Sequence, residues 1–251
     1  MTIREYGLIG YPLSHSFSQK YFTEKFHREG INDAVFHAFS IPTIDYLPHL
    51  IEEHPKLKGF AVTIPYKREV MQFLDSQTTA VEDMHACNCV CIRHGKLHGY
   101  NTDVIGFEKS FIRYLQPHHT RALILGTGGA SSAVAFVLDQ LHIDYRYVSR
   151  QRDADRHILS YSDIDANMLS LYTVIINCTP LGTYPKVEDA PEIPYHLLTD
   201  KHYLFDLVYN PAKTKFLELG EQQGAAIQNG YDMLILQAEE NWKLWNEAGD
   251  L

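Results

Sequence analysis

The sequence predicts an α/β protein of two domains, and three observations carry that prediction. Short apolar runs alternate with amphipathic stretches, which is typical of strand–helix–strand units in mostly parallel sheets. A second series of such units begins after an expected helix at residues 104–114, so we expect two sheets. The chain has 251 residues, of which 45% are hydrophobic, and this is enough apolar material for two cores.

The first series predicts an N-terminal domain. Its runs predict strands at residues 6–9, 35–39 and 59–64, and helices at 19–28, 44–53 and in a segment that ends at 74. Phe22 and Phe26 stand four residues apart and therefore give the first helix one apolar side. His94-Gly95 separates two further runs, which predicts a hairpin of residues 87–93 with 96–100.

The second series predicts a doubly wound domain. Its pattern predicts strands at 122–125, 145–148, 172–176, 203–205 and 225–227, helices at 133–141, 214–223 and 232–247, and a loop at 183–194. Trp242 and Trp245 fall on one side of the last helix. We expect residues 1–104 with 231–251 to form one domain, residues 105–230 to form the other, and a cleft to lie between them.

Charge and hydropathy argue against several classes of partner. The net charge is −9 and the Lys and Arg residues are scattered, which argues against nucleic acid. The N-terminus has no charged segment followed by a long apolar run, and no apolar run elsewhere is long enough to span a bilayer. We therefore expect a cytoplasmic protein with no membrane partner. We further expect a small-molecule substrate and a monomer or a homodimer.

Cysteine and histidine spacing predicts no metal site. Cys87, Cys89 and Cys91 alternate, which predicts that they share one face of a strand, and their spacing differs from the C-x-x-C pair of a zinc site. We expect buried, reduced thiols. The fourteen histidines form no H-E-x-x-H pattern.

The segment 121–131, RALILGTGGAS, joins a buried strand to a helix through a glycine-rich turn. Strand, glycine turn and helix in this order predict a dinucleotide site. Gly126 permits the tight turn, Gly128 lets the backbone approach a pyrophosphate, and the helix N-terminus presents free N–H groups to it. Ser131 stands where the usual pattern has its third glycine, so a plain strand–turn–helix is the alternative.

The next strand ends in a sequence that favours NADP over NAD. An NAD site places Asp or Glu about twenty residues past the glycines, at the end of that strand. Here the strand is followed by Ser149, Arg150, Gln151 and Arg152, with no carboxylate. Arginine forks suit a phosphate, and the alternative is that these arginines are only solvated.

Polar residues follow most of the expected strands. Parallel sheets bind ligands beyond the carboxyl ends of their strands, so we expect the polar residues after each strand to lie on one rim, and two sheets with facing rims would make a cleft. These residues are Ser14, Ser16, Thr63, Lys67, Asn101, Asp103, Gly126, Thr179 and Tyr209. Lys67 is the candidate proton donor, because a charged ammonium can stabilise a developing alkoxide and then protonate it. Asp103 could orient Lys67 or bind a substrate hydroxyl, and a surface ion pair is the alternative for either residue.

Eight features in register along essentially the whole chain resemble the shikimate dehydrogenase family. They are GYPLSHSFS, AVTIPYK, the residue Asn88, GYNTDVIG, GTGGAS, NCTPLG, DLVYNP and GYDMLILQA. The resemblance implies a Rossmann-like cofactor domain. It also implies the reversible NADPH-dependent reduction of 3-dehydroshikimate to shikimate, in chorismate and aromatic amino-acid biosynthesis.

The resemblance also implies roles for individual residues. The catalytic pair is expected to be Lys67 and Asp103, and the hydroxyls of Ser14 and Ser16, near Tyr209, are expected to bind the substrate carboxylate. The remaining substrate contacts are expected from Thr63, Asn88, Asn101, Thr102 and Gln237. NADP(H) is expected to contact Gly126, Gly128, Gly129, Ala130, Ser149, Arg150, Arg152, Thr179 and Gly230.

The chain departs from the family pattern at four positions, and these leave other functions open. The substitutions are Gln19 for Pro, Ala61 for Asn, Cys89 for Thr and Ser149 for Asn. They bear on substrate specificity and cofactor affinity more than on the reaction. The alternatives are a quinate/shikimate dehydrogenase with relaxed cofactor use, a non-catalytic ligand sensor, and a folate-type dehydrogenase of similar architecture.

Overall fold

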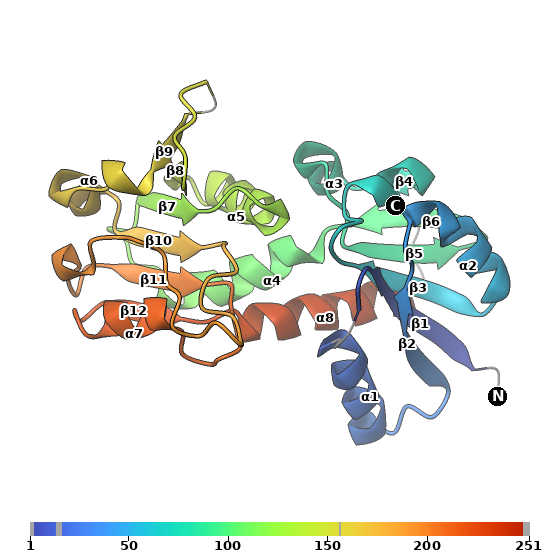
Figure 1. Ribbon diagram of the computed structural model, residues 1–251. Coiled ribbons are helices and arrows are strands. Elements are labelled where there is room, and N and C mark those ends of the chain that lie inside the picture. The colour runs from blue at the N-terminus through green and yellow to red at the C-terminus, as the bar shows by residue number, and fades with distance from the viewer. Residues whose placement is uncertain (1–2, 14–16, 156, 248–251) are drawn as a thin grey trace. The chain divides into compact units, whose positions relative to one another are not determined.

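The computed structural model describes residues 3–13, 17–155 and 157–247, which form two compact α/β units (Figure 1). One unit runs to Thr102 and resumes at Ala238, and the other is Asp103–Gln237. We expected the boundaries after residues 104 and 230. The second division falls inside a single continuous helix, α8 (Tyr231–Asn246). The predicted fold class, with two parallel-rich sheets, is confirmed.

The first unit has a six-stranded mixed sheet in the order β2-β1-β3-β5-β6-β4. Its strands are β1 (Arg4–Gly10), β2 (Ala34–Ser40), β3 (Leu57–Val62), β4 (Ser76–Gln77), β5 (Cys89–Arg93) and β6 (Lys96–Tyr100). β1 pairs in parallel with both β2 and β3, whereas β5 is antiparallel to β3 and β6. The predicted hairpin is therefore present as β5–β6.

Helices cover both faces of this sheet. They are α1 (Phe17–Glu29), α2 (Leu47–Glu53) and α3 (Thr79–Met84), with short 3-10 turns at Ile44–Tyr46 and Glu69–Phe73. Phe22 and Phe26 of α1 pack in one core with Tyr6, and Tyr6 also contacts Trp242 and Trp245 of α8. The predicted apolar sides of the first and last helices are thus confirmed.

Two predictions for this unit are wrong. The segment that ends at Leu74 forms a 3-10 turn, because only a few residues separate the turn at Tyr66 from β4. Cys87 packs in the core that contains Val90, whereas Cys89 and Cys91 pack in the core of the other face. Cys87 precedes β5, so the alternation of a strand does not extend to it.

The second unit has a parallel sheet in the order β12-β11-β10-β7-β8-β9. Its strands are β7 (Arg121–Leu125), β8 (Asp144–Ser149), β9 (Ile158–Ser160), β10 (Val174–Asn177), β11 (Tyr203–Asp206) and β12 (Ala226–Gln228). Read from β9, this is the 3-2-1-4-5-6 order of the dinucleotide-binding fold, in which the strand order reverses between β7 and β10.

Helices pack on both faces of the second sheet as well. They are α4 (Thr102–Phe111), α5 (Gly129–Gln140), α6 (Ala166–Leu171), α7 (Lys215–Glu221) and α8, with 3-10 turns at Ile112–Tyr114, Tyr161–Asp163 and Tyr195–Leu197. Phe107 and Phe111 of α4 contact Phe205 and Tyr203 of β11 at ring distances of 5.1 and 5.3 Å. Leu204, between these two, packs on the other face in the core that contains Leu169 and Phe216.

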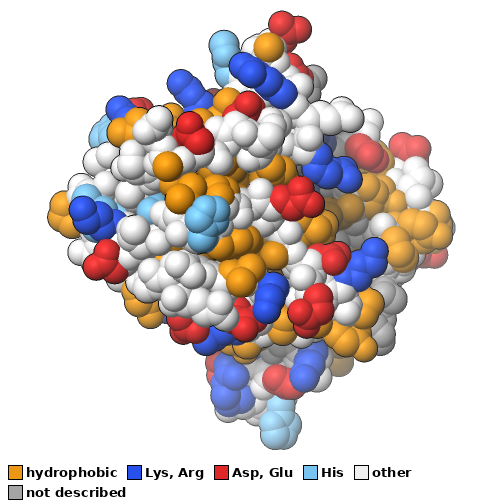
Figure 2. Space-filling model, turned by 60° about the vertical axis from the view of Figure 1, so that its left-hand side comes forward, with side chains coloured by type: hydrophobic (Ala, Val, Ile, Leu, Met, Phe, Trp, Pro, Cys, Tyr) orange, Lys and Arg blue, Asp and Glu red, His pale blue; other side chains and the backbone are white. Residues whose placement is uncertain are grey.

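The surface view shows interspersed charges. On the face drawn in Figure 2, Lys and Arg side chains alternate with Asp and Glu side chains. Among the described residues, no helix is both long and apolar enough to cross a membrane.

Candidate active site

The glycine turn lies between β7 and α5, at the point where the strand order of the second sheet reverses. Gly126 has a φ of +97°, and a Cβ added to it would lie 2.9 Å from Cγ2 of Thr179. The adjacent residue Cys178 donates from its backbone N–H to the carbonyl oxygen of Leu125 (2.9 Å). Both the backbone conformation and the close approach of the β10 loop therefore require glycine at 126.

The N-terminus of α5 forms an open cradle. Gly128 is the N-cap residue and supplies no side-chain cap, and the first turn contains no acidic residue. A Cβ added at Gly128 or Gly129 would meet nothing within 4 Å. The first N–H groups of a helix have no partner within the helix, and Ala130 belongs to this turn. The cradle therefore fits an anionic group such as a pyrophosphate.

Cationic side chains follow the neighbouring strand β8. Ser149 is its last residue, and Arg150 and Arg152 come directly after it and are exposed. Nη1 of Arg152 lies 3.9 Å from Oδ1 of Asp163, and its side chain is 65% exposed. These groups fit a dinucleotide that carries an additional phosphate on its ribose.

A buried polar network holds the loops after β10 and β11. Oδ1 of Asp206 accepts hydrogen bonds from Nδ2 of Asn177 (2.9 Å) and from the N–H of Val208 (3.0 Å). Thr214 donates to Oδ2 of Asp206 (2.5 Å). Oδ1 of Asn177 accepts from the backbone N–H (3.0 Å) and the hydroxyl (2.6 Å) of Thr179.

Burial raises the pKa of Asp206 to about 6, although these hydrogen bonds act in the opposite direction. Sequence reasoning missed this network, and its only signal was that Asn177 and Asp206 stand in the segments NCTPLG and DLVYNP. The network orients the loop of Thr179 and the start of the loop that carries Tyr209. Burial also raises the pKa of Tyr209. Next to it, the carbonyl of Val208 accepts a hydrogen bond from the backbone N–H of Gly230 (3.2 Å).

In the first unit, Thr63 and Lys67 lie on a turn directly after β3. The N–H of Thr63 donates to Ile9 (2.9 Å), and the carbonyl of Thr63 accepts from the N–H of Tyr66 (2.9 Å). Tyr66 is buried and its hydroxyl donates to the carbonyl of Ile41 (2.6 Å). The backbone of Lys67 accepts from the N–H of Cys87 (2.8 Å). The turn that carries the lysine is therefore fixed at both ends.

Asn88, Asn101 and Thr102 form a second buried group at the ends of β5 and β6. Oδ1 of Asn88 accepts from the N–H of Thr102 (2.7 Å), and the hydroxyl of Thr102 also reaches Oδ1 of Asn241 (2.6 Å). Nδ2 of Asn101 donates to the carbonyl of Ala86 (2.8 Å). Oδ1 of Asn101 is buried and has no hydrogen-bond partner, so it can accept a hydrogen bond from a ligand.

Asp103 and Gln237 lie on two helices that touch in the second unit. Asp103 is in the first turn of α4, and Nε2 of Gln237, on α8, donates to the carbonyl of Leu234 (2.9 Å). A Cβ added to Gly106 of α4 would lie 3.1 Å from Cβ of Gln237. Ser14 and Ser16 lie outside the described residues.

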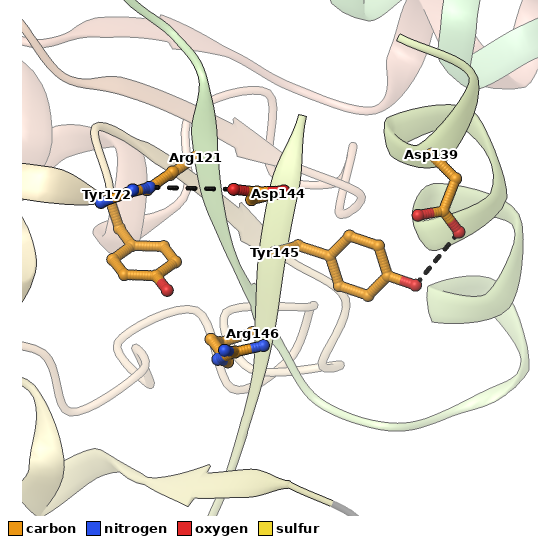
Figure 3. A pocket seen from close by; sticks show the side chains of 6 residues that line it. All are labelled: Arg121, Asp139, Asp144, Tyr145, Arg146 and Tyr172. Atoms are coloured by element: carbon orange, nitrogen blue, oxygen red, sulfur yellow. Dashed lines mark hydrogen bonds and ion pairs between the residues drawn. The ribbon is translucent and has the colours of Figure 1, made fainter. Parts of the chain in front are cut away.

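A pocket of about 480 Å³ lies at the opposite end of the second sheet (Figure 3). Arg121 and Asp144, the first residues of β7 and β8, line it together with Asp139, Tyr145, Arg146 and Tyr172. Nε of Arg121 lies 3.9 Å from Oδ2 of Asp144, and the hydroxyl of Tyr145 donates to Asp139 (3.3 Å). None of the predicted site residues lines this pocket.

Comparisons with known proteins give consistent matches. The family profile described as the shikimate dehydrogenase substrate binding domain matches residues 8–90. The chain is 34% identical to the shikimate dehydrogenase (NADP(+)) of Staphylococcus aureus, over 98% of this chain and 94% of that protein.

Two crystal structures extend the match to the fold. A chorismate mutase/shikimate 5-dehydrogenase fusion protein from Clostridium acetobutylicum is 31% identical, with a TM-score of 0.87 over 98% of this chain and 92% of that chain. The shikimate 5-dehydrogenase of Thermus thermophilus, solved with NADP(H) and shikimate, is 26% identical, with a TM-score of 0.83 over 97% of this chain and 94% of that chain.

Proposed function

Because the chain belongs to the shikimate dehydrogenase family, we propose that it catalyses the reversible NADPH-dependent reduction of 3-dehydroshikimate to shikimate. This is a step of chorismate and aromatic amino-acid biosynthesis. The observation that carries the proposal is 34% identity to a curated enzyme over 98% of the chain, with Lys67, Asp103 and the glycine turn all present.

NADP(H) is the proposed cofactor, and its nicotinamide supplies a hydride when it is bound. Gly126, Gly128, Gly129 and Ala130 hold the pyrophosphate, since the cradle is open and its first turn carries no acid. Ser149, Arg150 and Arg152 bind the 2′-phosphate. Thr179 and Gly230 complete the cofactor site from the loops after β10 and β12.

Hydroxyl and amide groups bind the substrate. Ser14 and Ser16, with Tyr209, hold its carboxylate, and the ring hydroxyls contact Thr63, Asn88, Asn101, Thr102 and Gln237. The buried, unpartnered Oδ1 of Asn101 supports this assignment, because a substrate hydroxyl would satisfy it. Thr102 also positions Asn88, since its N–H donates to Oδ1 of that residue.

Lys67 is the proposed general acid. Its ammonium stabilises the negative charge that develops on the C3 oxygen and then donates a proton to that oxygen. The hydrogen bonds of the Tyr66 hydroxyl and of the Cys87 N–H support this role, because they fix the turn and so restrict the position of the Lys67 backbone. Asp103 orients Lys67 or binds the hydroxyl next to the reacting carbon.

We also propose a cytoplasmic location and a monomeric or homodimeric state. All four cysteines are free thiols, as is usual in a reducing compartment. Light scattering on the purified protein decides between monomer and dimer.

The decisive test is an absorbance assay. The purified protein is offered shikimate or quinate, each with NADP⁺ and with NAD⁺, and formation of the reduced nicotinamide is followed. We expect turnover mainly with shikimate and NADP⁺. Turnover mainly with quinate or NAD⁺ would indicate the quinate/shikimate alternative, with Ala61 and Ser149 as the first residues to revert. A folded protein that is inactive in every combination would indicate a ligand sensor.

A further inference from the structure

Three side chains of the first unit bring metal-ligating atoms together. Glu5 lies near the start of β1, His37 lies in the middle of β2, and His54 follows α2. Oε2 of Glu5 is 2.7 Å from Nδ1 of His54 and 3.7 Å from Nε2 of His37. One ligand atom from each residue lies within 4.8 Å of the others.

Strand pairing explains why residues so distant in sequence meet. His37 is the register partner of Gly7, on the same face of β1 as Glu5. The backbone carbonyl of His54 accepts from the N–H of Leu57, which starts β3 beside β1. The ring of Phe39 packs 5.4 Å from His37 and 4.8 Å from His54, and it occupies the space that a side chain on Gly7 would fill.

One imidazole nitrogen of this cluster has no hydrogen-bond partner. Nε2 of His37 is buried, and Glu5 Oε2 lies beyond hydrogen-bond distance from it. A buried polar atom without a partner is costly, so a ligand that coordinates it would gain free energy. The side chains of Glu5, His54 and His37 are 19%, 29% and 35% exposed, so the cluster lies close to the surface of the unit.

We propose that Glu5, His37 and His54 form a zinc site. With bonds of about 2.0–2.1 Å, the ligand atoms of a tetrahedral zinc ion stand roughly 3.3–3.4 Å apart. The two distances to Oε2 of Glu5, 2.7 and 3.7 Å, bracket that spacing. Two imidazole nitrogens and one carboxylate oxygen select zinc over magnesium or calcium, and water fills the fourth position.

The ion would act on stability and not on the reaction. It would join β1, β2 and the turn that leads into β3. Glu5 lies near the amino end of its strand, whereas Thr63 and Lys67 follow the carboxyl end of β3. On binding, Nδ1 of His54 loses the hydrogen that it shares with Glu5, and this proton is released or moves to Nε2. The sequence predicted no metal site, because no local spacing joins these three positions.

The test uses the protein after treatment with a chelator. Calorimetric titration with zinc measures the stoichiometry and the Kd, and thermal unfolding measures the change in Tm. We expect one zinc ion per chain and a Tm higher by roughly 5–10 °C at 100 times the Kd. His37→Gln and His54→Gln should each weaken binding by at least about tenfold. His49→Gln is the matched control, since His49 lies on α2 and pairs with Glu52 and Glu53 outside the cluster.

Cobalt(II) absorption of the wild-type protein gives a second readout that does not depend on the folding of any variant. A visible band typical of a four-coordinate site supports the proposal. Absence of stoichiometric binding to the wild type would overturn it, as would equal binding by the His37→Gln and His54→Gln variants. An equal loss of zinc affinity in His49→Gln would place the ion on the surface of α2 and would also overturn the proposal.

Discussion

The turn that carries Lys67 is held by neighbouring residues. The buried Tyr66 precedes the lysine, and the N–H of Cys87 holds its carbonyl. Lys67→Ala keeps the backbone hydrogen bonds of this turn and removes the side chain beyond Cβ, including the ammonium. We expect kcat for shikimate oxidation to fall about 10²–10⁴-fold, the usual contribution of a general acid, with KM changed less than about threefold.

Lys96→Ala is the control for this experiment, because Lys96 is an exposed lysine on β6. Its kinetics should match the wild type. A Lys67→Ala enzyme with normal kcat would remove Lys67 from the chemistry.

Arg150 is the residue on which, in our proposal, the choice of cofactor depends. It follows β8 and is exposed, so its removal should disturb the fold little. A charge-assisted hydrogen bond contributes roughly 1.5–3 kcal/mol. Arg150→Ala should therefore raise KM for NADPH by about 10–100-fold and leave KM for NADH nearly unchanged. Arg146→Ala, on β8 and in the pocket of Figure 3, should change neither KM. Equal effects of Arg150→Ala on the KM values of both cofactors would contradict the assignment.

Asp206 makes the stability of the fold depend on pH. Its pKa is about 6 in the folded protein and near 3.9 in an unfolded chain, so between these values the folded state binds the proton more tightly. Stability therefore falls as the pH rises through this window, by up to roughly 3 kcal/mol from this group. Asp206→Asn should remove that slope, so its free energy of unfolding relative to wild type should increase from pH 4 to pH 6.5.

Denaturant titrations at several pH values measure this difference. Asp200→Asn, at an exposed position, is the matched control and should keep the wild-type slope. A variant at 206 whose pH dependence equals that of the wild type would show that the carboxyl is not responsible.

Among the elements, the turn from β7 to α5 was predicted best, since Gly126 and the apolar runs around it are local features. Helix α5 nevertheless begins at Gly129, four residues before the apolar run that predicted it. The sequence did not predict this start, because glycine has low helix propensity and two glycines stand at 128 and 129. The open cradle at the N-terminus of α5 explains why glycines stand there.

Gly128→Ala tests this turn as a cofactor site. Gly128 has φ −79° and ψ 179°, which alanine adopts without strain, and its Cβ would enter open space. Stability should stay within about 1 kcal/mol of wild type. The methyl group would occupy the place of the pyrophosphate, so KM for NADPH should rise by at least about tenfold while KM for shikimate stays unchanged. Unchanged NADPH kinetics would place the cofactor elsewhere.

Several short elements escaped prediction. β4, α3, β9 and α6 contain between two and six residues each. Runs of this length show no resolvable periodicity, and tertiary contacts decide whether they form. For example, β4 exists because Ser76 pairs with His98 of β6.

Each of the two units has its own cores and its own set of proposed ligand-binding residues. The unit that ends at Thr102 carries Thr63, Lys67, Asn88 and Asn101, and the other carries the glycine turn and Arg150. Hydrogen exchange should therefore respond separately to the two ligands. We expect NADP⁺ alone to slow exchange at residues 126–131 and 149–152, and shikimate alone to slow it at 63–67 and 101.

Mass spectrometry of peptic fragments resolves these segments. Residues 89–93 of β5 serve as an internal reference that neither ligand should alter. Protection of 126–131 by shikimate alone, with no change at 63–67, would contradict the proposed division of roles.

Local features of the sequence were enough to predict the α/β class, the two series of units, the glycine turn and the family. Each of these depends on local periodicity or on spacing along the chain. The tertiary structure alone decided the strand orders, the side of the sheet that receives Cys87, the buried carboxyl of Asp206 and the meeting of Glu5 with His37 and His54. These features depend on which strands pair, and pairing joins residues whose distance in sequence carries no signal of their contact.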